Sequence, residues 1–177
     1  LEDFRQANAL DLSEFEAAGY DAVLLMGPLY HLLESGQRLQ AVREARRLLR
    51  PGGVLAASFI TRYAPFREAA LNDPGWVFED FSYALRLLRT GIHDKQAGFT
   101  RAHFAHVSEV QPLMAEAGLE QIVLVGCEGF CAELEGAANG LQGAQWEQWL
   151  DLNEETANDP AALAMADHLL YLGRKTN

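Results

Sequence analysis

Histidine is the first residue type to consider, because an imidazole changes its charge near neutral pH without help from its surroundings. His31 and His106 are candidate general bases, and His31 is the better placed because it follows a predicted strand. Tyr30, beside it, is a third candidate catalytic residue that could orient a substrate or pack on a cofactor. Structural roles for these three side chains remain open. The other histidines are interpreted as structural: His93, His103 and His168.

Two short apolar runs, residues 22–26 and 54–60, flank a helical pattern in the sequence. Residues 50–53, Arg-Pro-Gly-Gly, end that helix because proline cannot continue it. Two apolar runs joined by a helix predict a βαβ unit in a parallel sheet covered on both faces. Such a crossover is right-handed, so both strands end at one edge of the sheet, where ligands bind in open α/β sheets. We therefore expect residues 27–31 and 61–63 to face one crevice.

This stretch resembles a known family. Residues 20–32, YDAVLLMGPLYHL, followed by RLLRPGG at 47–53, are similar to the fourth and fifth strands of class I S-adenosylmethionine-dependent methyltransferases. The resemblance extends to FTRAHFAHVSEV at 99–110 and AEAGLEQIVLVGCEG at 115–129. It implies an α/β fold with a Rossmann-like, doubly wound, mostly parallel sheet and a helical lid insertion. Residues 1–177 would form a single methyltransferase-type domain.

The resemblance also implies S-adenosylmethionine as the cofactor, with Met26, Gly27 and Pro28 at the binding edge. Asn8 stands where the family has an acidic residue that accepts a hydrogen bond from the adenine amine, and the backbone N–H of the next residue, Ala9, would donate to the ring. An asparagine carbonyl can accept the same bond, although an ordinary polar turn is the alternative. The family's glycine-rich turn has no counterpart, since no G-x-G occurs. We therefore expect the N-terminal strands to be missing, leaving about the C-terminal two-thirds of the domain. We expect no metal.

Residues 63–104 contain eight of the 17 aromatic side chains. An insertion after the second strand of the unit would lie over the binding edge, which predicts a lid that forms the acceptor site. Tyr63, Phe66 and Arg62 are the candidate substrate-binding residues. Core packing of the two aromatics, and a surface ion pair for Arg62, are the alternatives. Helical spacing predicts that four further side chains form the lid's own core: Phe78, Phe81, Leu85 and Leu88.

Beyond the lid, Ser108 is the predicted N-cap of a helix over residues 109–117. Residues 119–125 are a predicted strand, 129–146 are loop-like and 145–157 form an amphipathic helix. Asp159 and Pro160 begin another helix. In the resembled fold, the last strand, residues 168–174, runs antiparallel to its neighbours.

Composition excludes several classes of protein. The formal charge is −11, and residues 102–173 contain 12 acidic side chains but no Lys or Arg. Because nucleic-acid binding needs several cationic contacts to phosphates, we expect no nucleic-acid partner. No apolar stretch is long enough to cross a membrane. The two cysteines are too few for a disulfide framework or a zinc site. These features predict a cytoplasmic protein of unknown oligomeric state.

Together the observations favour methyl transfer from S-adenosylmethionine to a small-molecule acceptor. Such a displacement needs a dry pocket, aligned reactants and often a base for the acceptor's proton. One alternative is a non-catalytic or truncated Rossmann-like fragment with weak nucleotide binding. A second is an NAD-dependent oxidoreductase, which shares the sheet but needs the same missing glycine turn.

Overall fold

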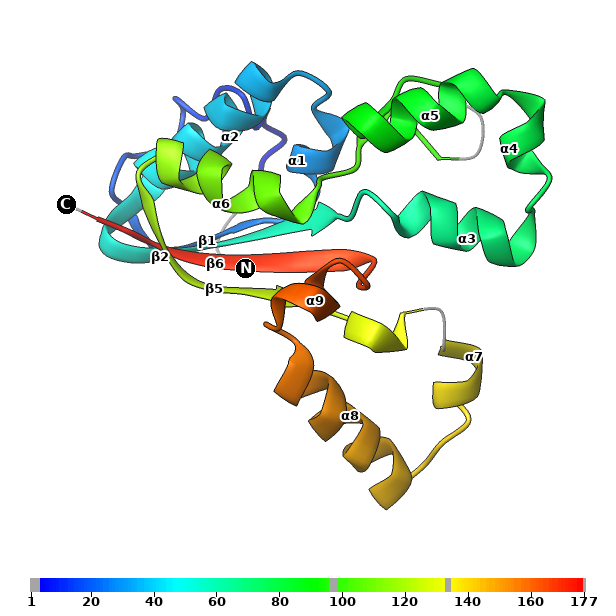
Figure 1. The fold of residues 1–177 in the computed structure, drawn as a ribbon. Helices are drawn as coiled ribbons and strands as arrows, with labels where there is room; N and C mark the ends of the chain where they lie inside the picture. Colours follow the sequence, from blue (N-terminus) through cyan, green and yellow to red (C-terminus); the bar gives the residue numbers. More distant parts are fainter. Residues whose placement is uncertain (1–3, 96–98, 133–134, 177) are drawn as a thin grey trace.

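The computed structural model describes residues 4–95, 99–132 and 135–176 (Figure 1). A four-stranded sheet forms its centre, and two arms project from it. The strands are β1 (Tyr20–Leu25), β2 (Leu49–Ile60), β3 (Ile92–His93), β4 (Ala102–His103), β5 (Leu119–Gly126) and β6 (His168–Lys175). The helices are α1 (Pro28–His31), α2 (Ser35–Leu48), α3 (Ala64–Asn72), α4 (Trp76–Glu79), α5 (Phe81–Thr90), α6 (Val107–Glu116), α7 (Glu135–Ala138), α8 (Ala144–Thr156), α9 (Pro160–Leu163) and the 3₁₀ turn η1 (Gly129–Cys131).

The strand order in the large sheet is β1-β2-β6-β5. β1 pairs with β2 in parallel, from Ala22 opposite Val54 to Leu25 opposite Ala57. β6 is antiparallel to both β2 and β5, so β1, β2 and β5 run in one direction. The prediction that the two apolar runs form neighbouring parallel strands is confirmed, and both strands end at the same edge of the sheet.

The helices α1, α2 and α6 lie together on one face of the sheet, whereas α9 lies on the other (Figure 1). On that second face Leu24 is 71% exposed. The doubly wound arrangement is therefore not present in the described residues. The connections from β1 to β2 and from β2 to β5 advance in the same direction along the sheet. Two right-handed crossovers that advance in the same direction place their helices on the same face.

The main core lies between this helix layer and the sheet. Val42 and Ala45 of α2 are fully buried against Leu55 and Ala57 of β2. The helix ends at Leu48, as the Arg-Pro-Gly-Gly break predicted, and residues 49–53 form an irregular start to β2. Among the described residues, no helix has both the length and the apolar character that crossing a bilayer requires.

The predicted lid, residues 63–104, forms the arm at the upper right of Figure 1, which we call the upper arm. Its core contains Tyr83, Leu87 and Phe104, with Trp76 and Phe66 packed against them. The predicted lid core was wrong at Phe78, Phe81 and Leu88, which are 88%, 59% and 38% exposed. The helix is interrupted at Asp80, where α4 ends and the Asp80 carboxylate caps α5. Residues 76–89 are therefore two helices, and a single helical repeat does not predict which of their side chains face inward.

A second arm, residues 127–159, which we call the lower arm, follows β5 and contains η1, α7 and α8 (Figure 1). The amphipathic helix predicted over residues 145–157 is present as α8. None of the α8 residues is buried. The two arms therefore leave the same edge of the sheet but differ in how completely they pack.

Candidate functional site

The end of β1 has an unusual turn. Gly27 follows Met26 with a φ of 127°, a conformation that a residue with a Cβ rarely adopts. A Cβ at this position would stand 3.6 Å from the Tyr30 hydroxyl. Pro28 then begins α1, because its missing N–H costs nothing at the first position of a helix. Met26 is 46% exposed, so the strand end presents both side chain and backbone at the surface.

Tyr30 and His31 stand at this edge as the sequence predicted. Their ring centroids lie 4.7 Å apart in an edge-on arrangement. The exposed imidazole of His31 also stacks on Phe99 of the upper arm, with centroids 6.2 Å apart and planes 15° apart. Phe99 in turn contacts Phe104 in the core of that arm. The candidate base therefore lies where α1 meets the upper arm.

Thr61, Arg62 and Tyr63 follow the end of β2. Arg62 is buried, and its guanidinium donates to the carbonyl oxygens of Phe104 and Arg89 at 2.8 and 3.1 Å. It also pairs with the Glu109 carboxylate at 2.5 Å. These bonds tie the end of α5 and the end of β4 to the sheet edge. This geometry engages Arg62 inside the protein, whereas the substrate-binding role predicted for it requires a free guanidinium.

Glu109 connects Arg62 to a histidine. Its other oxygen lies 3.4 Å from Nε2 of His103, which is buried. Burial raises the pKa of the Glu109 carboxyl, but the His103 hydrogen bond and the Arg62 charge outweigh this effect and bring the pKa to about 2. Burial lowers the pKa of His103. The cluster borders a cavity of about 660 Å³ between α2 and α6.

Sequence reasoning did not single out Glu109, because it took Ser108 as the N-cap of α6. The observed N-cap is His106, whose Nδ1 accepts from the Ser108 N–H while Glu109 bonds back to the His106 N–H. The spacing His-x-x-Glu is the signal that could have found this capping box. The cap fixes Glu109 where its carboxylate can reach Arg62 and His103.

His106, the second candidate base, has different neighbours from His31. Nδ1 of His106 lies 2.7 Å from the Ser108 hydroxyl, and its ring meets Tyr63 edge-on with centroids 6.1 Å apart. Phe66 faces the core of the upper arm, where its ring lies 5.8 Å from Trp76. The predicted residues thus form two groups, one around His31 at the end of β1 and one around Tyr63 at the end of β2.

Asn8 and Ala9, the predicted adenine contacts, lie in a turn before β1. The Asn8 side-chain oxygen accepts from the Leu10 N–H at 3.0 Å, and Ala9 packs against the main core. Glu44 and Arg47 of α2 hold this turn by bonding to the Leu12 backbone. The Asn8 oxygen keeps a second lone pair that can accept another hydrogen bond.

Comparison with known proteins agrees with the resemblance noted in the sequence. Residues 2–57 match the family described as "Methyltransferase domain". A SAM-dependent methyltransferase from Methanosarcina mazei has 17% identity and a TM-score of 0.58 over 98% of this chain and 67% of its own. A possible histamine N-methyltransferase from Thermotoga maritima has 17% identity and a TM-score of 0.52, with 96% and 62% covered.

A third solved structure shows how far this fold can diverge in activity. The [4+2]-cyclase SpnF has 16% identity and a TM-score of 0.50, with 98% of this chain and 56% of its own covered. This chain therefore spans 56–67% of the lengths of these three proteins. At such identities the similarity establishes the fold, and activity has to be argued from the site.

Proposed function

We propose, from the premise that this chain carries a class I S-adenosylmethionine-dependent methyltransferase domain, that it transfers a methyl group to a small-molecule acceptor. The parallel pairing of β1 and β2 carries this proposal. It supports a shared site at the edge where the two strands end, because ligands of open α/β sheets bind outside the carboxyl ends of the strands.

The end of β1 fits one side of the cofactor. The left-handed turn at Gly27 leaves the backbone free of a Cβ, and the adjoining Met26 is exposed. We assign Met26, Gly27 and Pro28 to the cofactor, with Asn8 and Ala9 on its adenine side through the second lone pair of Asn8. When bound, S-adenosylmethionine would supply an electrophilic methyl group on a sulfonium.

The acceptor side would lie between this edge and the upper arm, which acts as the lid. His31 is the preferred base, because its ring is exposed and touches the arm through Phe99. Tyr30 would orient the acceptor, and Tyr63 would line its pocket. His106 is less suited, because Nδ1 is engaged by Ser108. Arg62 would act as a positioning residue that holds the arm over the edge through Phe104, Arg89 and Glu109.

Calorimetric titration of the purified chain tests the cofactor assignment, with S-adenosylhomocysteine and NAD as the two ligands. We expect S-adenosylhomocysteine to bind and NAD to give no saturable heat. Saturation by NAD alone would favour the oxidoreductase, and the absence of binding by either ligand would favour the non-catalytic fragment. Transfer of a labelled methyl group to a panel of amines, phenols and carboxylates then tests catalysis.

A further inference from the structure

The lower arm contains a cavity that the proposed methyl-transfer site does not use. It lies between η1 and α8 and has a volume of about 370 Å³. Trp146, Trp149, Leu150 and Asn153 of α8 line it. Their spacing of three and four residues places them on one face of the helix. Trp149 and Leu150 nevertheless remain 41% and 43% exposed, so the protein itself does not fill the space. This volume is within the range of small-molecule sites.

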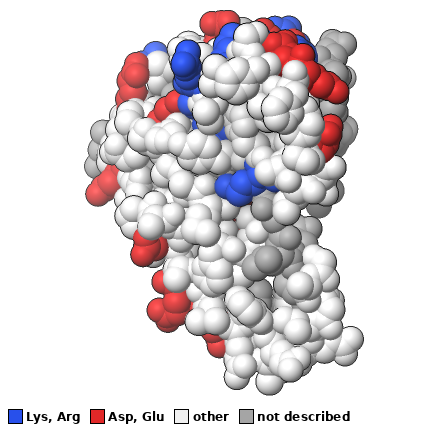
Figure 2. Space-filling model, turned by 45° about the vertical axis from the view of Figure 1, so that its right-hand side comes forward, with Lys and Arg blue, Asp and Glu red and all other residues white. Residues whose placement is uncertain are grey.

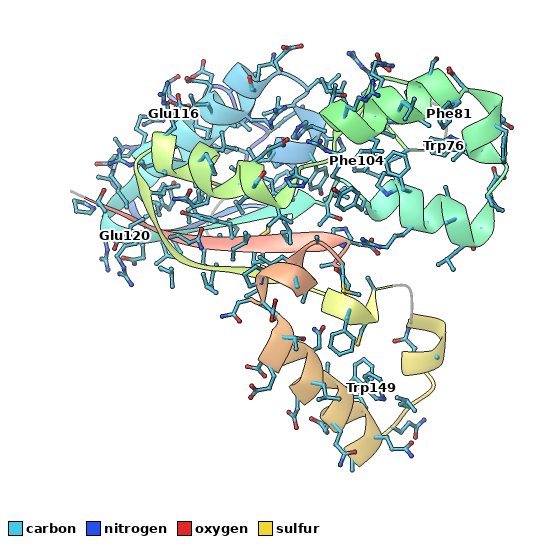
Figure 3. All side chains as sticks on the ribbon, viewed as in Figure 1. Trp76, Phe81, Phe104, Glu116, Glu120 and Trp149 are labelled. Carbon is cyan, nitrogen blue, oxygen red and sulfur yellow. The ribbon has the colours of Figure 1, made fainter. Side chains whose placement is uncertain are left out.

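Aromatic rings form much of the wall. Two of the three tryptophans of the chain line the cavity, and Figure 3 shows Trp149 on the side of α8 that faces η1. The Phe130 ring of η1 lies 6.3 Å from that of Trp149. The faces of indole rings attract cations, and this attraction is stronger where water is partly excluded.

A carboxylate lies on the wall opposite the helix. Glu128 follows the end of β5 and accepts from the backbone N–H groups of Asp167 and His168 at 3.2 and 2.9 Å. Burial raises the pKa of the Glu128 carboxyl, but the bonds from the His168 side chain and backbone outweigh it and lower the pKa. The group is therefore ionised at neutral pH. Burial raises the pKa of both cysteine thiols beside it, Cys127 and Cys131, so they stay neutral.

The surroundings carry mostly negative charge, with two exceptions. Arg67 pairs with Asp167 and lies beside Phe130 and Ala132, and the His168 imidazole is bonded to Glu128. Residues 102–173 include no Lys or Arg, and α8 adds Glu147, Asp151, Glu154 and Glu155 to its exposed surface. On the face drawn in Figure 2, the lower part of the described molecule carries acidic but not basic side chains. Asn153 also lines the cavity, and its side-chain amide donates to the Cys127 carbonyl oxygen at 3.0 Å, which ties α8 to the end of β5. The resulting potential attracts cations and repels anions.

We propose that the cavity between η1 and α8 binds a small organic cation with an apolar body, such as a protonated arylalkylamine. The indole rings would hold the apolar body and the Glu128 carboxylate would attract the ammonium group. A neutral analogue would lose the charge attraction, and an anion would be excluded. This site is separate from the edge where β1 and β2 end, so the proposal does not depend on methyl transfer.

Titration calorimetry of the whole chain with phenethylammonium chloride tests the proposal directly. The neutral probe is 2-phenylethanol and the anionic probe is phenylacetate, both close to the cation in size. We expect saturable binding of the cation, at least tenfold weaker binding of the alcohol and no binding of the anion. Equal binding of the cation and the alcohol would reduce the cavity to an apolar cleft and overturn the proposal, as would no binding of the cation at millimolar concentration.

Matched variants locate the binding. Glu128→Gln and Trp149→Leu should each weaken the cation at least tenfold. Glu155→Gln removes the same charge from the opposite face of α8 and should change the affinity less than twofold. Circular dichroism checks that each variant is folded. If Glu128→Gln unfolds because it loses the hydrogen bonds to the backbone of residues 167–168, Trp149→Leu, on the exposed helix, still tests whether the ligand binds in this cavity. Unchanged affinity in Trp149→Leu would contradict the proposal.

Discussion

The upper and lower arms leave the same edge of one sheet, yet they are built differently. The upper arm packs Tyr83, Leu87 and Phe104 into a core of its own, and Figure 3 shows Trp76 and Phe104 in the space between α3 and α5. The lower arm has no buried side chain on α8, its longest helix. An arm that fills its own interior is suited to hold a fixed wall of a site, whereas an arm that leaves an apolar face open is suited to receive a ligand.

Removing the anchor of the upper arm should have the largest effect. Arg62→Ala leaves the Glu109 carboxylate and the Phe104 carbonyl without their partner. Leaving a buried acceptor without its partner costs about 1–3 kcal/mol of unfolding free energy, and Arg62 serves the carbonyl oxygens of both Phe104 and Arg89. Urea denaturation followed by circular dichroism measures this cost. Arg86→Ala, which breaks the exposed pair with Asp94, is the control and should cost less than about 1 kcal/mol. Equal losses in the two variants would show that Arg62 does not anchor the arm.

A pair of leucine truncations compares the two arms directly. Leu87→Ala in α5 creates a cavity in a packed core and should cost about 2–5 kcal/mol. Leu152 of α8 is 53% exposed, so Leu152→Ala should cost about 0.5 kcal/mol or less. Urea midpoints of the two variants give the difference. A large loss at Leu152 would mean that α8 packs its apolar face against the protein as tightly as α5 does.

Kinetic measurements on two variants distinguish the two candidate bases, His31 and His106. If His31 removes the acceptor's proton, His31→Ala should lower turnover by about 100-fold or more while the affinity for S-adenosylhomocysteine stays nearly constant. His106→Ala should leave turnover within a few-fold of the unchanged protein. Equal losses of turnover and affinity in His31→Ala would make His31 structural, and a larger loss in His106→Ala would reverse the assignment.

Acid should weaken the upper arm through Glu109. Its pKa in the folded chain is about 2, below its ordinary value of 4.5, so its stabilisation is complete above pH 4.5 and is lost as the pH falls towards 2. Because the side chain is 43% exposed, solvent screening limits the effect to about 1 kcal/mol. Urea midpoints from pH 6 to pH 3 measure it. Glu109→Gln should flatten that part of the curve, and an unchanged slope would exclude Glu109 as its source.

The centre of the fold could be predicted from the sequence, because long-range pairing followed from local patterns. Two apolar runs and a helix break at residues 50–53 were sufficient to place β1 beside β2. The arms could not be predicted to the same degree. The interruption between α4 and α5 at Asp80 changed which aromatic side chains face inward. The N-cap of α6 lies two residues before the predicted one, and this cap places Glu109 beside Arg62. Periodicity detects helix faces but does not detect where one helix ends and the next begins.

The central claim is that the end of β1 holds the cofactor, and two glycine substitutions test it most directly. Gly27 and Gly52 both have positive φ, 127° and 78°, so an added Cβ strains the backbone at each position. Gly27 lies at the proposed binding edge, whereas Gly52 lies near the start of β2, at the other end of the strand pair. Calorimetry with S-adenosylhomocysteine should show at least tenfold weaker binding for Gly27→Ala and unchanged binding for Gly52→Ala. Unchanged binding in Gly27→Ala would contradict the account.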